Sequence, residues 1–274
     1  MKTLLTRSIS GLIFVALVIL SLMLEQIYFL VFSSIVVGIG LFEFHKLFSK
    51  QKQFEHPWSI TVILGLLVFF SSILPSYFIY IFSLNLIWLV PLIILIYGAL
   101  QLLVFKEKAT SFFLFIAAIL YIVVPFYLGF KVHIQDTGAV PIILGVFLLV
   151  WTNDTFAYLL GNIFGKHKLY EKVSPNKTWE GFAGGVAFAI IMGFILDQYI
   201  YVDAGYAPYF WVKSAMFIAP AAVAGDLFQS ALKRKMKVKD TGTIMPGHGG
   251  ILDRFDAILF ALPVFYLLLY FGAI

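Results

Sequence analysis

Two apolar runs near the start of the chain decide its class. Residues 8–24 read SISGLIFVALVILSLML, and residues 27–48 read IYFLVFSSIVVGIGLFEFHKLF. Little more than Glu25 and Gln26 separates them. Because about 20 apolar residues in a helix cross the hydrocarbon core of a bilayer, each run is long enough for one crossing. The two runs therefore predict two consecutive transmembrane helices.

The composition extends this interpretation to the whole chain. Of the 274 residues, 62% are hydrophobic and 12% are charged, and the mean hydropathy is +0.99. A soluble domain has about 45–50% apolar and about 25% charged residues. Lipid is therefore expected to be the main solvent of this chain. The sequence has no cysteine, which excludes disulfides, thiolate metal sites and cysteine nucleophiles.

Seven further apolar runs bring the expected number of transmembrane helices to about nine. They cover residues 58–74, 77–105, 110–130, 140–164, 179–201, 209–232 and 251–274. The run at 77–105 is oversized for one perpendicular crossing, so we expect a tilted helix bent near Pro91, or two segments. The predicted fold is an all-α polytopic integral membrane protein. We expect a single membrane domain over residues 1–274, with an N-terminal helical part at about 1–135 and a catalytic part at about 136–274.

The positions of the Lys and Arg residues indicate the orientation. Cytoplasmic loops of membrane proteins carry an excess of these residues. Nine spans with a cytoplasmic N-terminus place 17 of the 19 basic residues inside, and only Lys131 and Lys213 outside. The C-terminus is then expected outside. The first apolar run has no clear small-residue cleavage site, so it is expected to be a retained anchor.

Ionisable side chains within apolar runs are candidates for function, because burying them in a membrane is costly. Asp154 lies in the run at 140–164, where a structural carboxylate bonded to a neighbouring helix is an equally good interpretation. Asp226 lies in the run at 209–232, and the spacing of four places Ser230 on the same helical face. Glu43 and His45 are expected at the membrane interface rather than in catalysis.

The densest pattern of charges and glycines is at residues 230–256, which read SALKRKMKVKDTGTIMPGHGGILDRFD. A basic cluster beside a membrane usually attracts anionic lipid headgroups. That explanation does not account for residues 246–250, PGHGG, whose glycines let backbone amides approach a ligand directly before a helix start that favours anions. The segment therefore predicts a phosphate-binding loop.

Carboxylates beside this loop predict a magnesium site. Asp253 and Asp256 are three residues apart, where the last apolar run begins. Mg²⁺ prefers oxygen ligands and is usually held by one or two carboxylates together with water and substrate phosphates. We expect Asp226 and Asp253 to be the leading pair of metal ligands, with Asp256 as a further candidate.

A second cluster with phosphate-binding character precedes the run at 179–201. Residues 172–181 read KVSPNKTWEG, in which Ser174 and Thr178 supply hydroxyls, Lys177 a charge and Glu180 a possible partner for a cation. An ordinary capped helix start explains the same pattern, since Ser, Thr or Asn followed by Glu is frequent there.

The segment at 230–256 resembles the signature of the phosphatidate cytidylyltransferases, also called CDP-diacylglycerol synthases. The resemblance rests on Ser230, Lys233, Arg234, Lys239, Asp240, Gly242, Pro246, His248, Gly249, Gly250, Asp253, Arg254 and Asp256. Residues 174–181, SPNKTWEG, resemble the second recognisable segment of that family. The N-terminal half contributes only its hydropathy.

The resemblance implies the reaction of CTP with phosphatidic acid to give CDP-diacylglycerol and pyrophosphate, with Mg²⁺, at the cytoplasmic face of the cell (inner) membrane. The expected catalytic residues are Lys233, Arg234, Lys239, Asp240, His248 and Arg254. The expected substrate-binding residues are Ser174, Lys177, Ser230, Gly249 and Gly250, and the metal ligands are Asp226, Asp253 and Asp256. His248 is a candidate hydrogen-bond donor to a phosphate or a candidate general base. The donor role is favoured, because an attacking phosphate that is already ionised needs little proton removal. The resemblance also suggests a homodimer, and no nucleic acid is expected among the partners.

Three alternatives explain less of the sequence. A cation-coupled transporter using Asp154 and Asp226 does not explain the glycine-rich loop. A nonenzymatic sensor of anionic lipids leaves the intramembrane acids unexplained. A CDP-alcohol phosphotransferase requires a closely spaced acidic motif that is not visible in this sequence.

Overall fold

The computed structural model describes residues 2–49, 56–77, 109–136, 138–202, 205–272 and 274. The apolar runs predicted within these ranges all form helices, which confirms the all-α class. The predicted helix at 77–105, with its bend near Pro91, lies outside the described residues except at Tyr77. A short hairpin of two strands was not predicted from the sequence.

The chain divides into two compact units. Unit 1 comprises residues 1–134 and 240–254, and unit 2 comprises residues 135–239 and 255–274. The chain therefore enters unit 1 again after Lys239 and leaves it after Arg254. This is a division by packing, and the functional division expected near residue 135 stays a prediction.

Unit 1 contains the N-terminal helices. They are α1 (Lys2–Met23), α2 (Gln26–Ser49), α3 (Trp58–Tyr77), α5 (Ala109–Ala118), the π-helical turn η2 (Ile119–Val123) and α6 (Val124–Gln135), whose last residue falls in unit 2. The helix α3 runs through Pro75 rather than ending there. The elements α5, η2 and α6 follow one another without a break and realise the helix expected at 110–130.

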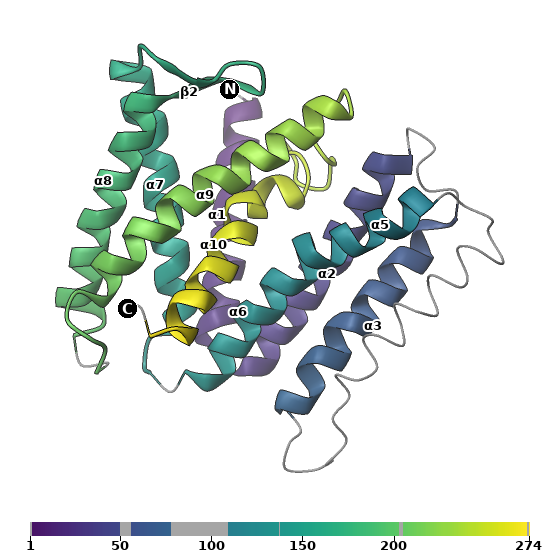
Figure 1. Ribbon diagram of the computed structural model, residues 1–274, viewed down its shortest axis with the longest axis horizontal. Helices are drawn as coiled ribbons and strands as arrows, with labels where there is room; N and C mark the ends of the chain where they lie inside the picture. The colour runs from purple at the N-terminus through teal and green to yellow at the C-terminus, as the bar shows by residue number, and fades with distance from the viewer. Residues whose placement is uncertain (1, 50–55, 78–108, 137, 203–204, 273) are drawn as a thin grey trace. The chain divides into compact units, whose positions relative to one another are not determined.

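Helix α2 packs against both α1 and α3 (Figure 1). A buried polar contact joins α2 to α3, in which Nδ1 of His45 lies 2.9 Å from Oγ1 of Thr61. Gly65 of α3 faces Leu41 of α2, and a Cβ at this glycine would collide with the leucine side chain. Small residues let membrane helices approach closely, so Gly65 permits this contact.

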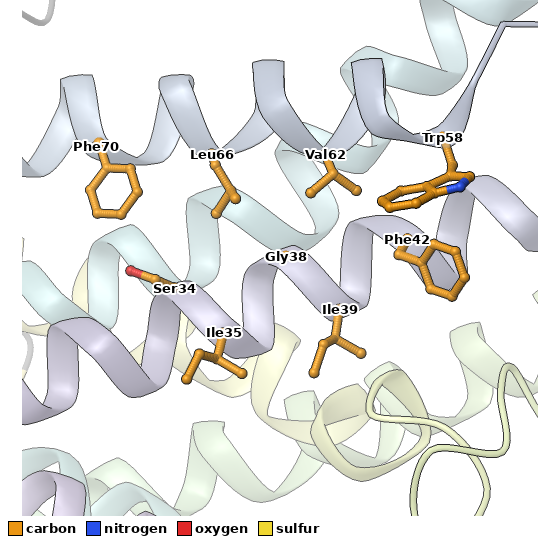
Figure 2. A pocket seen from close by; sticks show the side chains of 9 residues that line it. All are labelled: Ser34, Ile35, Gly38, Ile39, Phe42, Trp58, Val62, Leu66 and Phe70. Carbon is orange, nitrogen blue, oxygen red and sulfur yellow. The ribbon is translucent and has the colours of Figure 1, made fainter.

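An apolar cavity of about 610 Å³ lies between α2 and α3. Figure 2 shows the side chains that line it: Ser34, Ile35, Gly38, Ile39, Phe42, Trp58, Val62, Leu66 and Phe70. The hydroxyl of Ser34 donates to the carbonyl of Leu30 at 2.7 Å, so this polar group is already bonded within its own helix. The cavity is therefore better suited to hydrocarbon than to water.

Unit 2 contains the hairpin and the C-terminal helices. They are α7 (Ile142–Phe164), β1 (Lys168–Tyr170), β2 (Ser174–Thr178), α8 (Trp179–Ile195), the π-helical turn η3 (Leu196–Ile200), α9 (Phe210–Lys235) and α10 (Leu252–Tyr270), whose first three residues belong to unit 1. The strands pair antiparallel, with Lys168 opposite Thr178. Helices α7, α8 and α9 pack against one another (Figure 1).

Trp211 is the centre of the core of unit 2. Its side chain is fully buried, and its ring stacks on Phe265 of α10 at a centroid distance of 5.9 Å. Gly145 of α7 faces the same indole, and a Cβ at this glycine would lie about 2.5 Å from ring atom Cζ2. The glycine is therefore required for α7 to reach the tryptophan.

Among the helices that the structure describes, five are long and apolar enough to cross a membrane. They span Gln26–Ser49, Thr110–Gln135, Ile142–Phe164, Trp179–Ile200 and Phe210–Lys235. Shorter apolar helices span Ser8–Met23 and Trp58–Ile73. Large apolar side chains on these helices face outward, such as Leu12 with 71% of its surface exposed. The chain is therefore a membrane protein, while the count of nine spans and the orientation stay predictions.

Candidate functional site

The candidate residues form two clusters, one in each unit. The cluster of unit 2 combines β2 with the C-terminal half of α9 and the first turns of α10. The cluster of unit 1 consists of the loop at 240–251 and the residues that hold it.

The basic end of α9 is at Lys235, and Lys237 turns the chain away from the helix. Its φ of +55° is in the left-handed region, and its amide donates to the carbonyl of Arg234 at 3.0 Å. The amide of Val238 donates to the carbonyl of Lys233 at 3.0 Å. These two bonds form the Schellman arrangement, which terminates a helix and satisfies its last carbonyls. Lys233 and Arg234 therefore stand in the final turn of a helix, where cations also interact favourably with its dipole.

Lys177 and Asp226 form the main ion pair of unit 2. Nζ of Lys177, on β2, lies 2.5 Å from Oδ2 of Asp226, on α9, and both side chains are partly exposed. Ser230 donates to Oδ1 of the same carboxylate at 3.2 Å, as the spacing of four predicted. The structure therefore brings together three of the predicted site residues.

Other charges surround this pair. Asp256, on α10, experiences the electrostatic repulsion of Asp226 and Asp154 and the attraction of Lys233. The fully buried Asn153 donates to Oδ1 of Asp154 at 3.1 Å. A carboxylate that two others repel is stabilised by nearby positive charge, which lysines or a metal ion could supply.

The hairpin is held at its base by Glu180. This carboxylate accepts hydrogen bonds from the amides of Lys166 and His167 and lies 2.6 Å from Nδ1 of His167. Thr178 caps α8 by accepting from the amide of Gly181 at 3.1 Å. The capped helix start considered from the sequence is thus confirmed. It does not exclude a role for Lys177, whose side chain points to Asp226.

In unit 1, the loop at 240–251 turns sharply at Pro246 and Gly247. The amide of His248 donates to the carbonyl of Met245 at 2.9 Å, and Gly247 has a φ of +76°. Proline followed by a residue with positive φ is the pattern of a type II turn. The amide of Met245 then donates to the carbonyl of Gly249 at 3.0 Å, and Gly249 has a φ of +89°. Both glycines are therefore needed for the backbone conformation itself.

The ring of His248 is held by α1. Oγ of Ser10 donates to the carbonyl of Pro246 at 3.1 Å and lies 2.8 Å from Nδ1 of His248. A hydroxyl has one proton, so a Ser10 that donates to Pro246 accepts from Nδ1–H of the histidine. In that arrangement Nε2 of the neutral ring is an acceptor, and donation from Nε2 to a phosphate requires the protonated ring. The sequence did not single out Ser10.

Asp253, in the first turn of α10, joins the two ends of the loop by hydrogen bonds. Oδ2 of this buried carboxylate accepts from the amide of Thr241 at 2.8 Å, from the Thr241 hydroxyl at 3.0 Å and from the amide of Gly250 at 3.0 Å. The predicted phosphate-binding amide of Gly250 is therefore bonded within the loop. Asp253 as a metal ligand stays a prediction, and a metal would have to bind through its other oxygen or displace these donors.

The chemistry of unit 2 suits Mg²⁺. Asp226, Asp256 and the hydroxyl of Ser230 supply oxygen donors, and the mutual repulsion of the carboxylates favours a cation. In the described part of the chain, no three His, Asp or Glu side chains gather as a complete ligand set. Mg²⁺ takes much of its coordination from water and substrate phosphates, and its binding here stays a prediction.

The remaining predicted residues are on the surface of their units. Arg234, Lys239, Asp240 and Arg254 are exposed, and Ser174 on β2 is half-buried. One guanidinium nitrogen of Arg234 donates to the carbonyl of Val238 at 3.3 Å. Glu43 and His45 are both buried inside unit 1, and their expected place at the membrane interface stays a prediction.

Comparison with known proteins gives the family. The model of the cytidylyltransferase family matches residues 5–271. The chain belongs to this family. A phosphatidate cytidylyltransferase of Bacillus subtilis (strain 168) is 35% identical over 216 residues, which cover 77% of this chain and 79% of the relative. Two other proteins of that name, from Staphylococcus saprophyticus and Staphylococcus aureus (strain COL), are 46% identical over 127 residues, about half of each chain.

The ion pair of Lys177 leads to a first prediction. Lys177→Met should lower the free energy of unfolding by about 1–2 kcal/mol, because it leaves Asp226 beside other carboxylates without its cation. Asp226→Asn should recover most of this loss in the double variant. Thermal unfolding of the purified protein in detergent measures both effects. Lys172→Met, at an exposed lysine of the same hairpin, is the matched control, and equal losses for the two lysines would contradict the ion pair.

Proposed function

We propose that this protein transfers CMP from CTP to phosphatidic acid, giving CDP-diacylglycerol and pyrophosphate for phospholipid synthesis. The observation that carries the proposal is the family match over residues 5–271, together with the relative from Bacillus subtilis that aligns over 79% of its length. The residues that carry the family resemblance include Lys177, which pairs with Asp226, and the loop that presents His248.

The reaction is a displacement at phosphorus. An oxygen of the lipid phosphate attacks the α-phosphorus of CTP, the bond from that phosphorus to the bridging oxygen of the β-phosphate breaks, and pyrophosphate leaves. The reactants are both strongly anionic, so the main tasks of the protein are to hold them in line and to neutralise their charge. Little proton transfer is needed, because the attacking phosphate is already ionised.

The basic residues suit these tasks. We assign Lys177, Lys233 and Arg234 of unit 2, with Lys239, to phosphate binding. Arg254 and His248 of unit 1 serve the same reaction, with His248 as a hydrogen-bond donor in its protonated form. Ser174, Ser230 and the glycines at 249 and 250 are proposed to contact substrate, and Asp240 to orient a neighbouring cation.

Mg²⁺ is proposed as the cofactor, held by Asp226 and Asp256. When bound, the ion would neutralise phosphate charge. Lys177 is paired with Asp226, so this lysine is proposed to turn to a substrate phosphate when the carboxylate binds metal. Asp253 remains a further candidate ligand whose described contacts lie within its loop.

The membrane topology is part of the proposal. Nine spans, a cytoplasmic N-terminus and an external C-terminus would place the basic hairpin and the loop at 233–254 at the cytoplasmic face of the cell membrane. CTP is a water-soluble substrate and requires access from that side. A homodimer is expected from the family resemblance. The alternative of a cation-coupled transporter is not supported, because the family is one of cytidylyltransferases.

The activity can be tested with CTP tritiated in the cytosine ring. Purified protein in detergent should transfer label into a chloroform-soluble product only when phosphatidic acid and Mg²⁺ are both present. Omitting either compound, or replacing phosphatidic acid by diacylglycerol, should abolish incorporation, because no phosphate nucleophile or no metal is then available. A folded preparation that incorporates no label with all components present would refute the proposal.

The metal assignment predicts how activity depends on Mg²⁺ concentration. Asp226→Asn and Asp256→Asn should each lower kcat about 100-fold or more and raise the Mg²⁺ concentration needed for half-maximal activity, because a carboxylate ligand is lost. Asp154→Asn is the matched control, since it removes the same charge from the same group of carboxylates. If Asp226→Asn retains the turnover and the Mg²⁺ dependence of the natural protein, the assignment fails.

The orientation can be tested by labelling, because the chain has no cysteine of its own. Lys213→Cys should react with a membrane-impermeant maleimide in intact cells, since Lys213 is expected outside. Lys172→Cys, in the hairpin, should react only after permeabilisation. The reverse pattern would overturn the proposed topology.

A further inference from the structure

Glu43 is a carboxylate in an unusual place. It lies in the apolar helix α2, where only 1% of its surface is exposed. A charged group inside a membrane helix is costly unless protein donors replace water. The contacts of Glu43 therefore indicate why the carboxylate is there.

Among the described residues, the hydrogen-bond donors to Glu43 come from the start of the loop at 240–251, from its end and from the residue that follows it. Oε1 accepts from the amide of Ile251 at 3.0 Å, and Oε2 accepts from the amide of Leu252 at 3.0 Å and from the hydroxyl of Thr241 at 3.0 Å. Leu252 is the first residue of α10, and the amides at a helix start have no partner within the helix. Glu43 thus satisfies buried donors that nothing in α10 itself satisfies.

Two glycines make room for this carboxylate. A Cβ at Gly250 would lie 2.5 Å and 2.6 Å from the two oxygens of Glu43, and a Cβ at Gly242 would collide with Oε1. Neither glycine has a positive φ, so the requirement is for space rather than for backbone conformation. The two glycines therefore leave the space that the Glu43 carboxylate occupies against the loop.

The hydroxyl of Thr241 joins Glu43 to Asp253. It lies 3.0 Å from Oε2 of Glu43 and 3.0 Å from Oδ2 of Asp253, while Asp253 also binds the amides of Thr241 and Gly250. Asp253 closes the loop on itself, whereas Glu43 fastens the closed loop to α2. The loop carries His248, and the first turn of the following helix, α10, carries Asp253 and Arg254.

We propose that Glu43 is a positioning residue for the reaction, which clamps both ends of the 240–251 loop to α2 and so fixes His248, Asp253 and Arg254. The inference rests on the proposed function for its catalytic meaning, but the clamp itself is a property of unit 1. Glu43 touches no substrate in this role and acts through the residues that it holds.

Hydrogen exchange measured by mass spectrometry tests the clamp directly. Glu43→Gln keeps the size of the side chain but replaces one acceptor oxygen by an NH₂ group that cannot accept from an amide or hydroxyl. The peptide covering 241–252 should then exchange about tenfold faster or more, because bonds to a charged acceptor are lost. Glu25→Gln is the matched control, since it makes the same chemical change at an exposed position.

A second variant tests the same contact from the loop. Gly242→Ala keeps the carboxylate but forces it away from the loop, so it should also speed exchange at 241–252 and serves if Glu43→Gln fails to fold. Gly145→Ala, which disturbs the packing on Trp211 in unit 2, controls for loss of stability alone. It should lower the melting temperature without selectively exposing 241–252.

Across the variants, kcat/KM should correlate with the hydrogen-exchange rate of residues 241–252 rather than with the melting temperature. We expect kcat/KM to fall about tenfold or more in Glu43→Gln and Gly242→Ala, and to stay within about twofold in Gly145→Ala at temperatures where that variant is folded. Unchanged exchange in folded Glu43→Gln and Gly242→Ala, or activity that follows melting temperature across all variants, would overturn the proposal. If the natural protein transfers no label from CTP to lipid, but the variants exchange faster at 241–252, then the clamp is supported and the proposed function is refuted.

Discussion

The structure depends on which donors and cations contact the carboxylates of a chain that has lipid as its main solvent. Lipid offers no hydrogen-bond donors, so each buried acid must find them in the protein. Glu43 accepts hydrogen bonds from two backbone amides and the Thr241 hydroxyl. Asp253 accepts from two backbone amides and the same hydroxyl. Asp226, which is partly exposed, pairs with Lys177 and accepts a hydrogen bond from Ser230. These contacts fix the segments that carry the candidate site.

The two clusters use their acids differently. In unit 1 the carboxylates bind neutral backbone groups and hold a loop whose glycines and proline define its path. In unit 2 the carboxylates repel one another and are balanced by lysines. The first arrangement fixes a loop through hydrogen bonds, while the second combines carboxylates with partly exposed basic side chains. A polyphosphate substrate with its metal is the kind of ligand that such a cluster of charges would accept.

The helices could be predicted from hydropathy because backbone N–H and C=O groups in lipid must form hydrogen bonds with one another, which a helix achieves within one segment. The spacing of Asp226 and Ser230 on one face was also predictable, since helical periodicity is local. The hairpin was not, because its strands are short and polar. Glu43 and Ser10 were missed as partners of the loop, because their contacts join residues more than 200 positions apart and no local pattern indicates them.

The central claim is that an oxygen of the lipid phosphate attacks the α-phosphorus of CTP. The most direct test compares CTP labelled with ³²P at the α or the γ position, incubated with the purified protein, phosphatidic acid and Mg²⁺. The account predicts that the α-label enters the chloroform-soluble lipid and that the γ-label appears only in water-soluble pyrophosphate. Transfer of the γ-label into lipid would mean phosphoryl rather than nucleotidyl transfer and would contradict the account.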